Sequence, residues 1–350
     1  MLGPLLLLCL SGGRPVLSGG SAVLTAQQHG ANGSRQTALG HSQELFLQFI
    51  AQYNRSRSPG RLGSAHQYKA FQESIQRQHA LNSLPSDLLV EKGSATYGIN
   101  QFSDLAPELF RATYLCSKPS ELPKYKPFDS EVKRLHLPTR FDWRDKNVVT
   151  RVRNQGSCGG CWAFSVVEVI ESAYAIKGKP LQTFSAQEVI DCSYKDGGCN
   201  GGSPVSALKW LNQTKTRLVT ESMYPFKAKT GMCHHFPMST FGISIKGYQA
   251  YSFRHKEEEM MHKLLEWGPL IAVVDAVSWQ DYLGGIIQHH CSPEESNHAV
   301  VITGYDRTGD IPYWIVRNSW GSTWGIDGFV HIKMKRNVCG IADSVAAGFV

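Results

Sequence analysis

The chain has 350 residues, of which 42% are hydrophobic and 19% are charged, a composition that excludes a disordered chain and is typical of a globular protein. The net charge is +7, but the basic excess lies mostly in the first 136 residues and contains no run of like charges. We therefore expect no nucleic-acid partner. The length allows two domains, or one domain and a pro-region.

The chain begins with a short apolar run at residues 5–10, followed by small residues over 18–26. This run is far shorter than the roughly 20 residues that cross a bilayer. It predicts a signal peptide over residues 1–25 and no membrane span. Asn-x-Ser/Thr glycosylation sequons at Asn32, Asn54 and Asn212 fit a secretory route.

Residues 26–136 carry the pattern of a pro-region. Apolar residues recur at helical spacing in two places, Leu45, Phe46, Phe49, Ile50 and then Tyr68, Phe71, Ile75. Residues 97–104 are rich in turn formers. Residues 117–136 contain prolines and lysines without a period, which predicts an extended, cleavable linker.

The composition changes at residue 137, and residues 137–350 read as one mature domain. Helices are predicted over 161–177, after the capping box Ser185–Glu188, after Ser203-Pro204 and over 256–267. Strands are predicted over 270–274, 299–302, 313–316 and 329–332. Helices in the first half and strands in the second favour an α+β protein of two lobes with a cleft between them.

Seven of the nine cysteines lie after residue 136. Three disulfides would leave one thiol, and disulfides indicate an oxidising compartment. Cys161 lies at the predicted start of the long helix, where the helix dipole favours a reactive thiolate. A redox pair with Cys158, or half of a zinc site, is the alternative for this Cys-x-x-Cys pattern.

Two further residues could complete a nucleophilic site. His298 heads an apolar strand and could act as a base for the thiol, although a structural histidine fits that position equally well. Asn318 stands among tryptophans, and its amide could orient an imidazole without adding charge, or could simply form a turn. Adjacent histidines elsewhere point in different directions, so we expect no metal and no cofactor.

Three segments together resemble the papain-like cysteine peptidases. They are Gln155-Gly-Ser-Cys158-Gly-Gly-Cys161-Trp162, Asn297-His298-Ala and Asn318-Ser-Trp320-Gly. Gly160 stands where that family has Ser or Ala. The resemblance covers residues 137–350 and, more loosely, residues 97–115, which contain the pro-region motif at 98–104. In the helix before that motif, Gln67 and Ser74 replace the usual Arg and Asn.

The resemblance implies a papain-like two-lobed fold, with a helical first lobe, a β-barrel-like second lobe, the active-site cleft between them and a helical inhibitory pro-region. It implies that Cys161 is the nucleophile, that His298 is its base, that Asn318 orients His298 and that the Gln155 amide helps to bind the oxyanion. The implied substrate-binding residues are Gly201, Gly202, Ser203, Pro204, Trp320 and Ser344. The implied disulfides are Cys158–Cys199, Cys192–Cys233 and Cys291–Cys339.

The expected activity is that of a cysteine endopeptidase made as a zymogen, because no extension or long insertion blocks one end of the cleft. The expected partners are polypeptide substrates, the chain's own pro-region as an intramolecular inhibitor, and cystatin-like inhibitors. The protein is expected to be a monomer that reaches the lysosome by the secretory pathway or is secreted. Two alternatives are a regulatory protein that kept the fold and lost turnover, and a thiol oxidoreductase using Cys158 and Cys161.

Overall fold

The computed structural model describes residues 41–55, 65–83, 93–117, 126–129, 136–234, 242–292 and 295–350. The chain divides into two compact units, Met1–Gln52 and Tyr53–Val350. In the first unit residues 41–52 are helical, and the rings of Phe46 and Phe49 stack with centroids 6.2 Å apart. The helical spacing of these apolar residues is therefore matched by a helix. The predicted signal peptide lies outside the described residues.

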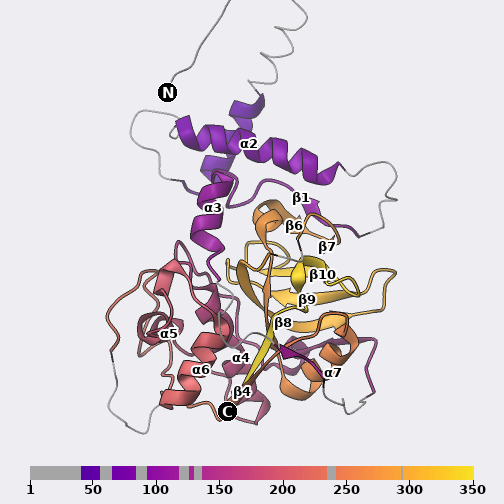
Figure 1. Cartoon of the computed structure of the whole chain (residues 1–350). Helices are drawn as coiled ribbons and strands as arrows, with labels where there is room; N and C mark the ends of the chain where they lie inside the picture. Colours follow the sequence, from indigo (N-terminus) through magenta and orange to yellow (C-terminus); the bar gives the residue numbers. More distant parts are fainter. Residues whose placement is uncertain are drawn as a thin grey trace, which may run out of the picture. The chain divides into compact units, whose positions relative to one another are not determined.

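A helical lobe follows the turn that contains Cys158. Its helices are α4 (Cys161–Ile176), α5 (Ala186–Cys192) and α6 (Pro204–Thr214), with the short 3₁₀ helix η2 (Gly198–Asn200). The predicted capping box begins α5, because Ser185 Oγ accepts from the Glu188 N–H at 2.9 Å. Helix α4 is buried along most of its length, since it lies between the other helices and the sheet (Figure 1).

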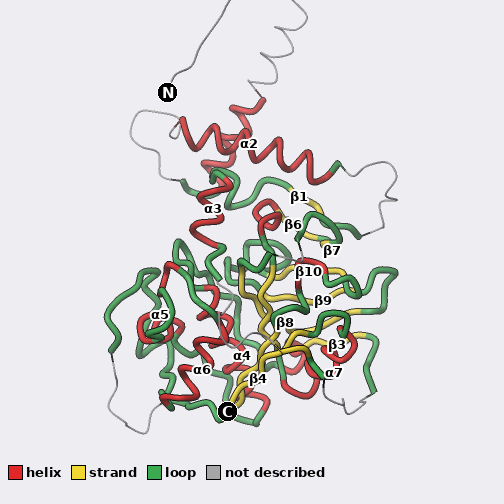
Figure 2. The backbone as a smooth tube through the Cα atoms, in the orientation of Figure 1, coloured by secondary structure: helices red, strands yellow, loops and turns green. Residues whose placement is uncertain are grey.

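The second lobe is built on a nine-stranded sheet with the order β2-β4-β11-β5-β8-β9-β10-β7, and β3 pairs with β8. The strands are β2 (Lys126–Pro127), β3 (Arg140–Asp142), β4 (Gly247–Ser252), β5 (Leu270–Val274), β7 (Ile286–Ile287), β8 (His298–Asp306), β9 (Tyr313–Arg317), β10 (Phe329–Lys333) and β11 (Val345–Phe349). Helix α7 (Glu257–Trp267) and the 3₁₀ helices η1 (Trp143–Lys146), η3 (Val277–Asp281) and η4 (Val338–Gly340) accompany them. Most neighbouring strands run antiparallel. Figure 2 shows these strands gathered in one lobe, in yellow.

Each lobe has its own hydrophobic core. One core surrounds α4 and contains Trp162 and Leu208, and the other lies in the sheet lobe and contains Trp314 and Trp324. Two disulfides, Cys158–Cys199 and Cys192–Cys233, stabilise the helical lobe, and Cys291–Cys339 lies in the sheet lobe. The predicted two-lobed α+β architecture is confirmed.

The pro-region of the second unit contributes α2 (Ala65–Asn82), β1 (Thr96–Tyr97) and α3 (Pro107–Tyr114). Strand β1 pairs with β6 (Tyr282–Gly284) of the mature region. Helix α3 leads towards the boundary between the two lobes (Figure 1). Part of the predicted linker forms β2, which pairs with β4. Within the described ranges no helix is long and apolar enough to cross a membrane.

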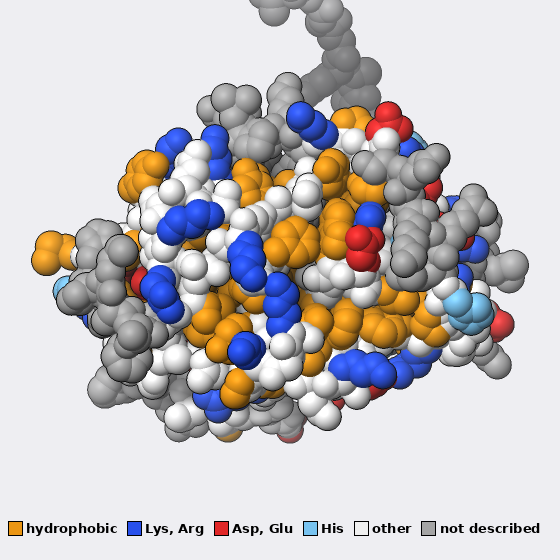
Figure 3. Space-filling view, turned by 90° about the horizontal axis from the view of Figure 1, so that it is seen from below, with side chains coloured by type: hydrophobic (Ala, Val, Ile, Leu, Met, Phe, Trp, Pro, Cys, Tyr) orange, Lys and Arg blue, Asp and Glu red, His pale blue; other side chains and the backbone are white. Residues whose placement is uncertain are grey.

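A shallow depression of about 580 Å³ is lined by Trp143, Ile176, Leu265 and neighbouring residues. Ile176 ends α4, whereas Cys161 begins it, so at about 1.5 Å per residue the depression lies roughly 20 Å from the thiol. Figure 3 shows the molecule from below, with hydrophobic side chains interrupted by Lys and Arg side chains. The depression is therefore separate from the chemistry at Cys161.

Candidate active site

Cys161 is the first residue of α4 and is fully buried. Burial raises the pKa of its thiol to about 12, although the N–H groups of Ala299, Trp162 and Cys116 favour the thiolate and oppose this rise. The contact with Ala299 brings the start of β8 beside the start of α4, so residues of both lobes meet at the sulfur. Burial therefore favours the neutral thiol over the thiolate in the closed site.

His298 is fixed in one tautomer by its partner. Its Nε2 lies 2.7 Å from Asn318 Oδ1, and that oxygen also accepts from the Ser319 N–H at 2.8 Å. Because the amide oxygen can only accept, Nε2 carries the proton and Nδ1 is the basic nitrogen. Nδ1 is buried and makes no hydrogen bond of normal geometry. Burial lowers the pKa of His298 to about 4, against the opposing effects of Asn318 and the Tyr114 carbonyl.

Trp320 covers this pair. Its ring lies over His298 with centroids 4.7 Å apart and an angle of 32° between the planes. Trp320 and the neighbouring Trp324 are fully buried, so water is kept away from the hydrogen bond between His298 and Asn318. Trp320 thus shields the imidazole, and its assignment to substrate binding stays a prediction.

Gln155 is held in place by Ser319. Ser319 Oγ donates to Gln155 Oε1 at 2.6 Å, which leaves the amide nitrogen to donate elsewhere. Nε2 donates to the Cys158 carbonyl at 3.0 Å and lies 3.5 Å from the Tyr114 carbonyl oxygen. Ser319 thus positions two of the predicted residues, and its only sequence signal was its place directly after Asn318.

The pro-region passes directly across these residues. The Gly202 N–H donates to the Cys116 carbonyl at 3.3 Å, and the Ser117 N–H donates to the Asn297 carbonyl at 2.9 Å. A Cβ added at Gly201 would lie 2.1 Å from the Cys116 carbonyl oxygen, so only glycine permits this approach. Since Gly202 belongs to the helical lobe and Asn297 to the sheet lobe, residues 114–117 bridge both. We call this form the closed precursor.

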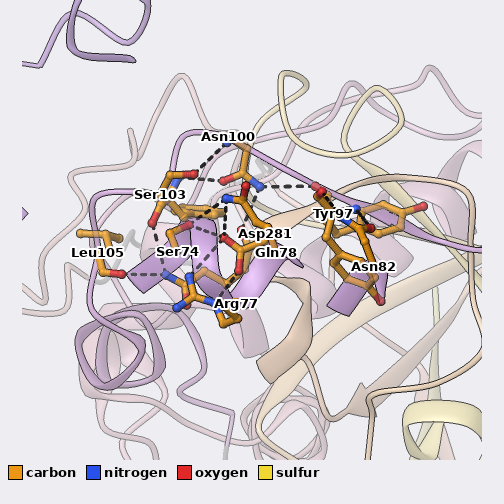
Figure 4. Close-up of polar contacts among 12 residues, drawn as sticks. Ser74, Arg77, Gln78, Asn82, Tyr97, Asn100, Ser103, Leu105 and Asp281 are labelled. Carbon is orange, nitrogen blue, oxygen red and sulfur yellow. Dashed lines mark hydrogen bonds and ion pairs between the residues drawn. The ribbon is translucent and has the colours of Figure 1, made fainter. Parts of the chain in front are cut away.

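Asp281 is the main polar contact of α2 on the mature region, and Figure 4 shows the side chains that converge on it. Ser74 Oγ donates at 2.8 Å, Arg77 Nε and Nη2 donate at 2.5 and 3.1 Å, and Gln78 Nε2 lies at 3.4 Å. The carboxylate is fully buried and Arg77 is 23% exposed. Sequence analysis had not identified Asp281 or Arg77 as a pair.

The turn after β1 adds further contacts. Asn100 Nδ2 donates to the Gln280 carbonyl at 2.8 Å, and the Phe102 ring meets Trp320 edge-on at 5.4 Å. Asp104 accepts from Arg55 at 3.2 Å and from Gln67 at 3.5 Å. Gln67 and Ser74, the two departures from the family pattern within α2, therefore both take part in polar contacts of the pro-region.

Buried ion pairs lie behind the site. Arg317 Nη2 is 3.1 Å from Glu168 Oε1, and Arg153 Nη2 is 3.0 Å from Glu171 Oε1. All four side chains are at most 7% exposed. Glu168 lies on α4, and Arg317 ends β9 directly before Asn318, so this pair connects the helix of Cys161 with the strand that leads to Asn318.

The remaining predicted residues are placed less directly. Ser203 caps α6 and Pro204 is buried in its first turn, while Ser344 immediately precedes β11; the pocket they would form stays a prediction. Asp343, beside Ser344, pairs with Arg254 at 2.8 Å. A Cβ on Gly160 would meet Ile190 at 3.0 Å.

The sequons stay predictions as well. Asn54 is exposed and Asn212 is half-buried on α6, where it accepts from Lys215. Asn32 lies outside the described residues.

Comparison with known proteins identifies the class. A family model described as papain family cysteine protease matches residues 137–349. The chain therefore belongs to the papain family of cysteine proteases, as the three motifs predicted, and it is a cysteine peptidase.

Individual relatives can be compared with the chain over most of its length. The chain is 63% identical to human cathepsin O over 283 residues, which are 80% of this chain and 87% of that protein. It is 60% identical to mouse cathepsin O over 283 residues, 80% of this chain and 89% of that one. Among solved structures, digestive procathepsin L2 from Tenebrio molitor larval midgut matches with a TM-score of 0.79 and 29% identity, covering 88% of this chain and 100% of that one.

The disulfide Cys158–Cys199 bears on the oxidoreductase alternative. A redox pair would need Cys158 to exchange with Cys161, and Cys158 is instead bonded to Cys199. No group of three or more potential metal-binding side chains occurs in the described part of the chain.

Proposed function

We propose that this chain is the zymogen of a lysosomal or secreted cysteine endopeptidase, with Cys161 as nucleophile and His298 as its proton acceptor. One observation carries the proposal. The Gln155 amide and His298 both lie against the Tyr114 carbonyl of the pro-region, and Cys161 lies against the Cys116 N–H two residues further on. Asn318 orients His298. These residues come from two lobes, so their convergence is a property of the fold and not of one local sequence.

The chemistry follows from these positions. The Cys161 thiol gives its proton to His298 Nδ1, and the thiolate attacks the scissile carbonyl of a peptide. The Cys161 backbone N–H and the Gln155 amide donate to the developing oxyanion. The imidazolium then protonates the leaving amine, which leaves a thioester on Cys161, and water hydrolyses it with His298 as base.

The same residues explain why the precursor would be inactive. Burial by the pro-region raises the pKa of Cys161 and lowers that of His298. Both shifts favour the neutral pair over the thiolate and imidazolium that the reaction requires. Departure of residues 114–117 would return water to both groups and reverse both shifts.

A substrate would replace residues 114–117 as an extended peptide. The backbone of Gly201 and Gly202 supports this, since it already accepts an extended segment of the pro-region. Ser203, Pro204 and Ser344 would line a neutral pocket for one substrate side chain. Because Asp343 is paired with Arg254, we do not expect a preference for a basic residue there.

The predicted signal peptide, the sequons and the disulfides support a route through the secretory pathway to the lysosome or to the exterior. Cystatin-like inhibitors would compete for the surface that residues 114–117 cover. We expect the processed protein to act as a monomer on polypeptide substrates, with mature residues 137–350.

The decisive experiment is turnover of a blocked dipeptide-fluorophore substrate at acidic pH by the processed protein, beside its Cys161→Ala variant. Turnover by the first and not by the second is expected. If neither turns over several substrates after the pro-region is shown to be removed, the chain is a binding protein that kept the fold.

A further inference from the structure

Cys116 and Cys161 are the two cysteines in the described ranges that form no disulfide. One belongs to the pro-region and the other is the proposed nucleophile. The backbone N–H of Cys116 contacts the Cys161 sulfur, and the Cys116 group also acts on it electrostatically. The closed precursor therefore places the backbone of Cys116 against the Cys161 sulfur at the point where the site is blocked.

The surroundings of Cys116 hold its side chain against Gly159, in the turn that leads into α4. A Cβ added at Gly159, two residues before Cys161, would lie 2.5 Å from Cys116 Cβ and 2.7 Å from Cys116 Sγ. The Cys116 backbone is held by the Gly202 N–H at 3.3 Å. Its Sγ donates to the Ala112 carbonyl at 3.1 Å. Turning Sγ towards Cys161 by a rotation about Cα–Cβ would give up this weak hydrogen bond.

We propose that Cys116 and Cys161 form a disulfide that locks the pro-region onto the nucleophile while the precursor is in an oxidising compartment. The oxidant is a small disulfide of the oxidised glutathione class. The thiolate of the half-buried Cys116 attacks it, forms a mixed disulfide and releases one glutathione thiolate. Cys161 then loses its proton, and its thiolate attacks the Cys116 sulfur and releases the second glutathione thiolate. Two protein thiols are oxidised, one glutathione disulfide is reduced, and the two cysteine protons go to the two glutathione thiols.

The disulfide would act on two levels at once. It would consume the nucleophile, and it would hold residues 114–117 across both lobes by a covalent bond. Acid alone would then not release the pro-region, and activation would require a reductant. Cys116 is half-buried, so a small reductant or oxidant can reach it without unfolding of the lobes.

The test uses the full-length precursor incubated with oxidised glutathione at pH 8, digested without reduction and analysed by peptide mass spectrometry. The expected result is one peptide pair joined through Cys116 and Cys161, two hydrogen masses below the sum of the thiol peptides. Glutathione on either cysteine without the joined pair, two unmodified thiols, or a link from Cys116 to Cys9 would each overturn the proposal.

A Cys116→Ser precursor is the matched control, because it removes one sulfur and leaves every proposed catalytic group in place. After oxidation it should yield no joined pair. Only the regulatory consequence of the Cys116–Cys161 disulfide rests on the proposed peptidase function. Cross-linking is measured by mass, so a precursor that cross-links but whose processed form has no turnover supports the disulfide and overturns the peptidase. Turnover without cross-linking supports the peptidase and overturns the disulfide.

Discussion

The contact between Arg77 and Asp281 allows the hold of the pro-region on the mature region to be tested quantitatively. We consider Arg77→Met, which keeps the aliphatic stem and removes both hydrogen bonds to a fully buried carboxylate. Truncating one partner of such a pair costs about 2–5 kcal/mol. Because Arg77 is 23% exposed, we take a value near the middle of that range, about 3 kcal/mol, which is about a hundredfold in the opening equilibrium.

Opening can be measured by alkylation of Cys161 in the uncleaved precursor at neutral pH. The thiol is fully buried in the closed form, so the labelling rate follows the fraction of molecules that are transiently open. Arg77→Met should label about a hundredfold faster than the unaltered precursor. Asp281→Asn should also label faster, and the double variant should show less than the sum of the two effects, because both changes remove one interaction.

Lys69→Met provides the control on the same helix. Lys69 lies 3.7 Å from Glu73, with exposures of 76% and 45%, and exposed pairs of this kind contribute little. Its labelling rate should stay within about twofold of the unaltered precursor. If a folded Arg77→Met precursor labels at the unaltered rate, Asp281 does not anchor the pro-region and the reasoning above is wrong.

Three further predictions concern single side chains. Burial lowers the pKa of His298 to about 4 from 6.5. As pH falls, His298 therefore takes up a proton in the open form before it does so in the closed form, and acid favours opening. Protection of the Ser117 N–H from hydrogen exchange, corrected for intrinsic rates, should fall roughly tenfold between pH 6.5 and pH 5. Gln155→Ala should lower kcat of the processed enzyme about 10²–10³-fold, and an unchanged kcat would remove it from the oxyanion site. Burial raises the pKa of Glu188 to about 7 from 4.5, so the free energy of unfolding falls as the carboxylate becomes charged with rising pH. In denaturant unfolding, Glu188→Gln should stabilise the protein by about 2 kcal/mol more at pH 8 than at pH 5. An equal effect at both pH values would contradict this.

The sequence predicted those parts of the fold that carry local signals. The capping box at Ser185 and the apolar runs at residues 270–274 and 313–316 each fixed an element within a residue or so of its observed bounds. Strands β4 and β11 were missed. Residues 345–349 are mostly small, and residues 247–252 are half-buried without an alternating pattern. Both segments are strands because they pair with each other, and because β11 also pairs with β5 and β4 with β2.

The residues of the site also fall into two groups, those with a local sequence signal and those without one. Cys161, His298, Asn318 and Gln155 stand in recognisable motifs, and sequence analysis named all four, although their catalytic roles stay proposals. The partners that the fold brings from far away were not predictable. Arg77 and Asp281 are 204 positions apart, and nothing in the sequence near either of them indicates the other. The place of Cys116 against Gly159 likewise exists only when the pro-region is folded onto both lobes.

The buried ion pairs behind the site and the exposed contacts of the pro-region should differ in their response to ionic strength. Mobile ions screen charges that water can reach, with a Debye length of about 10 Å at 0.1 M salt, and screen buried pairs far less. Arg317 and Glu168 are at most 3% exposed, whereas Arg55, which pairs with Asp104, is 35% exposed. Salt should therefore weaken the attachment of the pro-region at Arg55 while the alignment of the two lobes behind Asn318 is maintained.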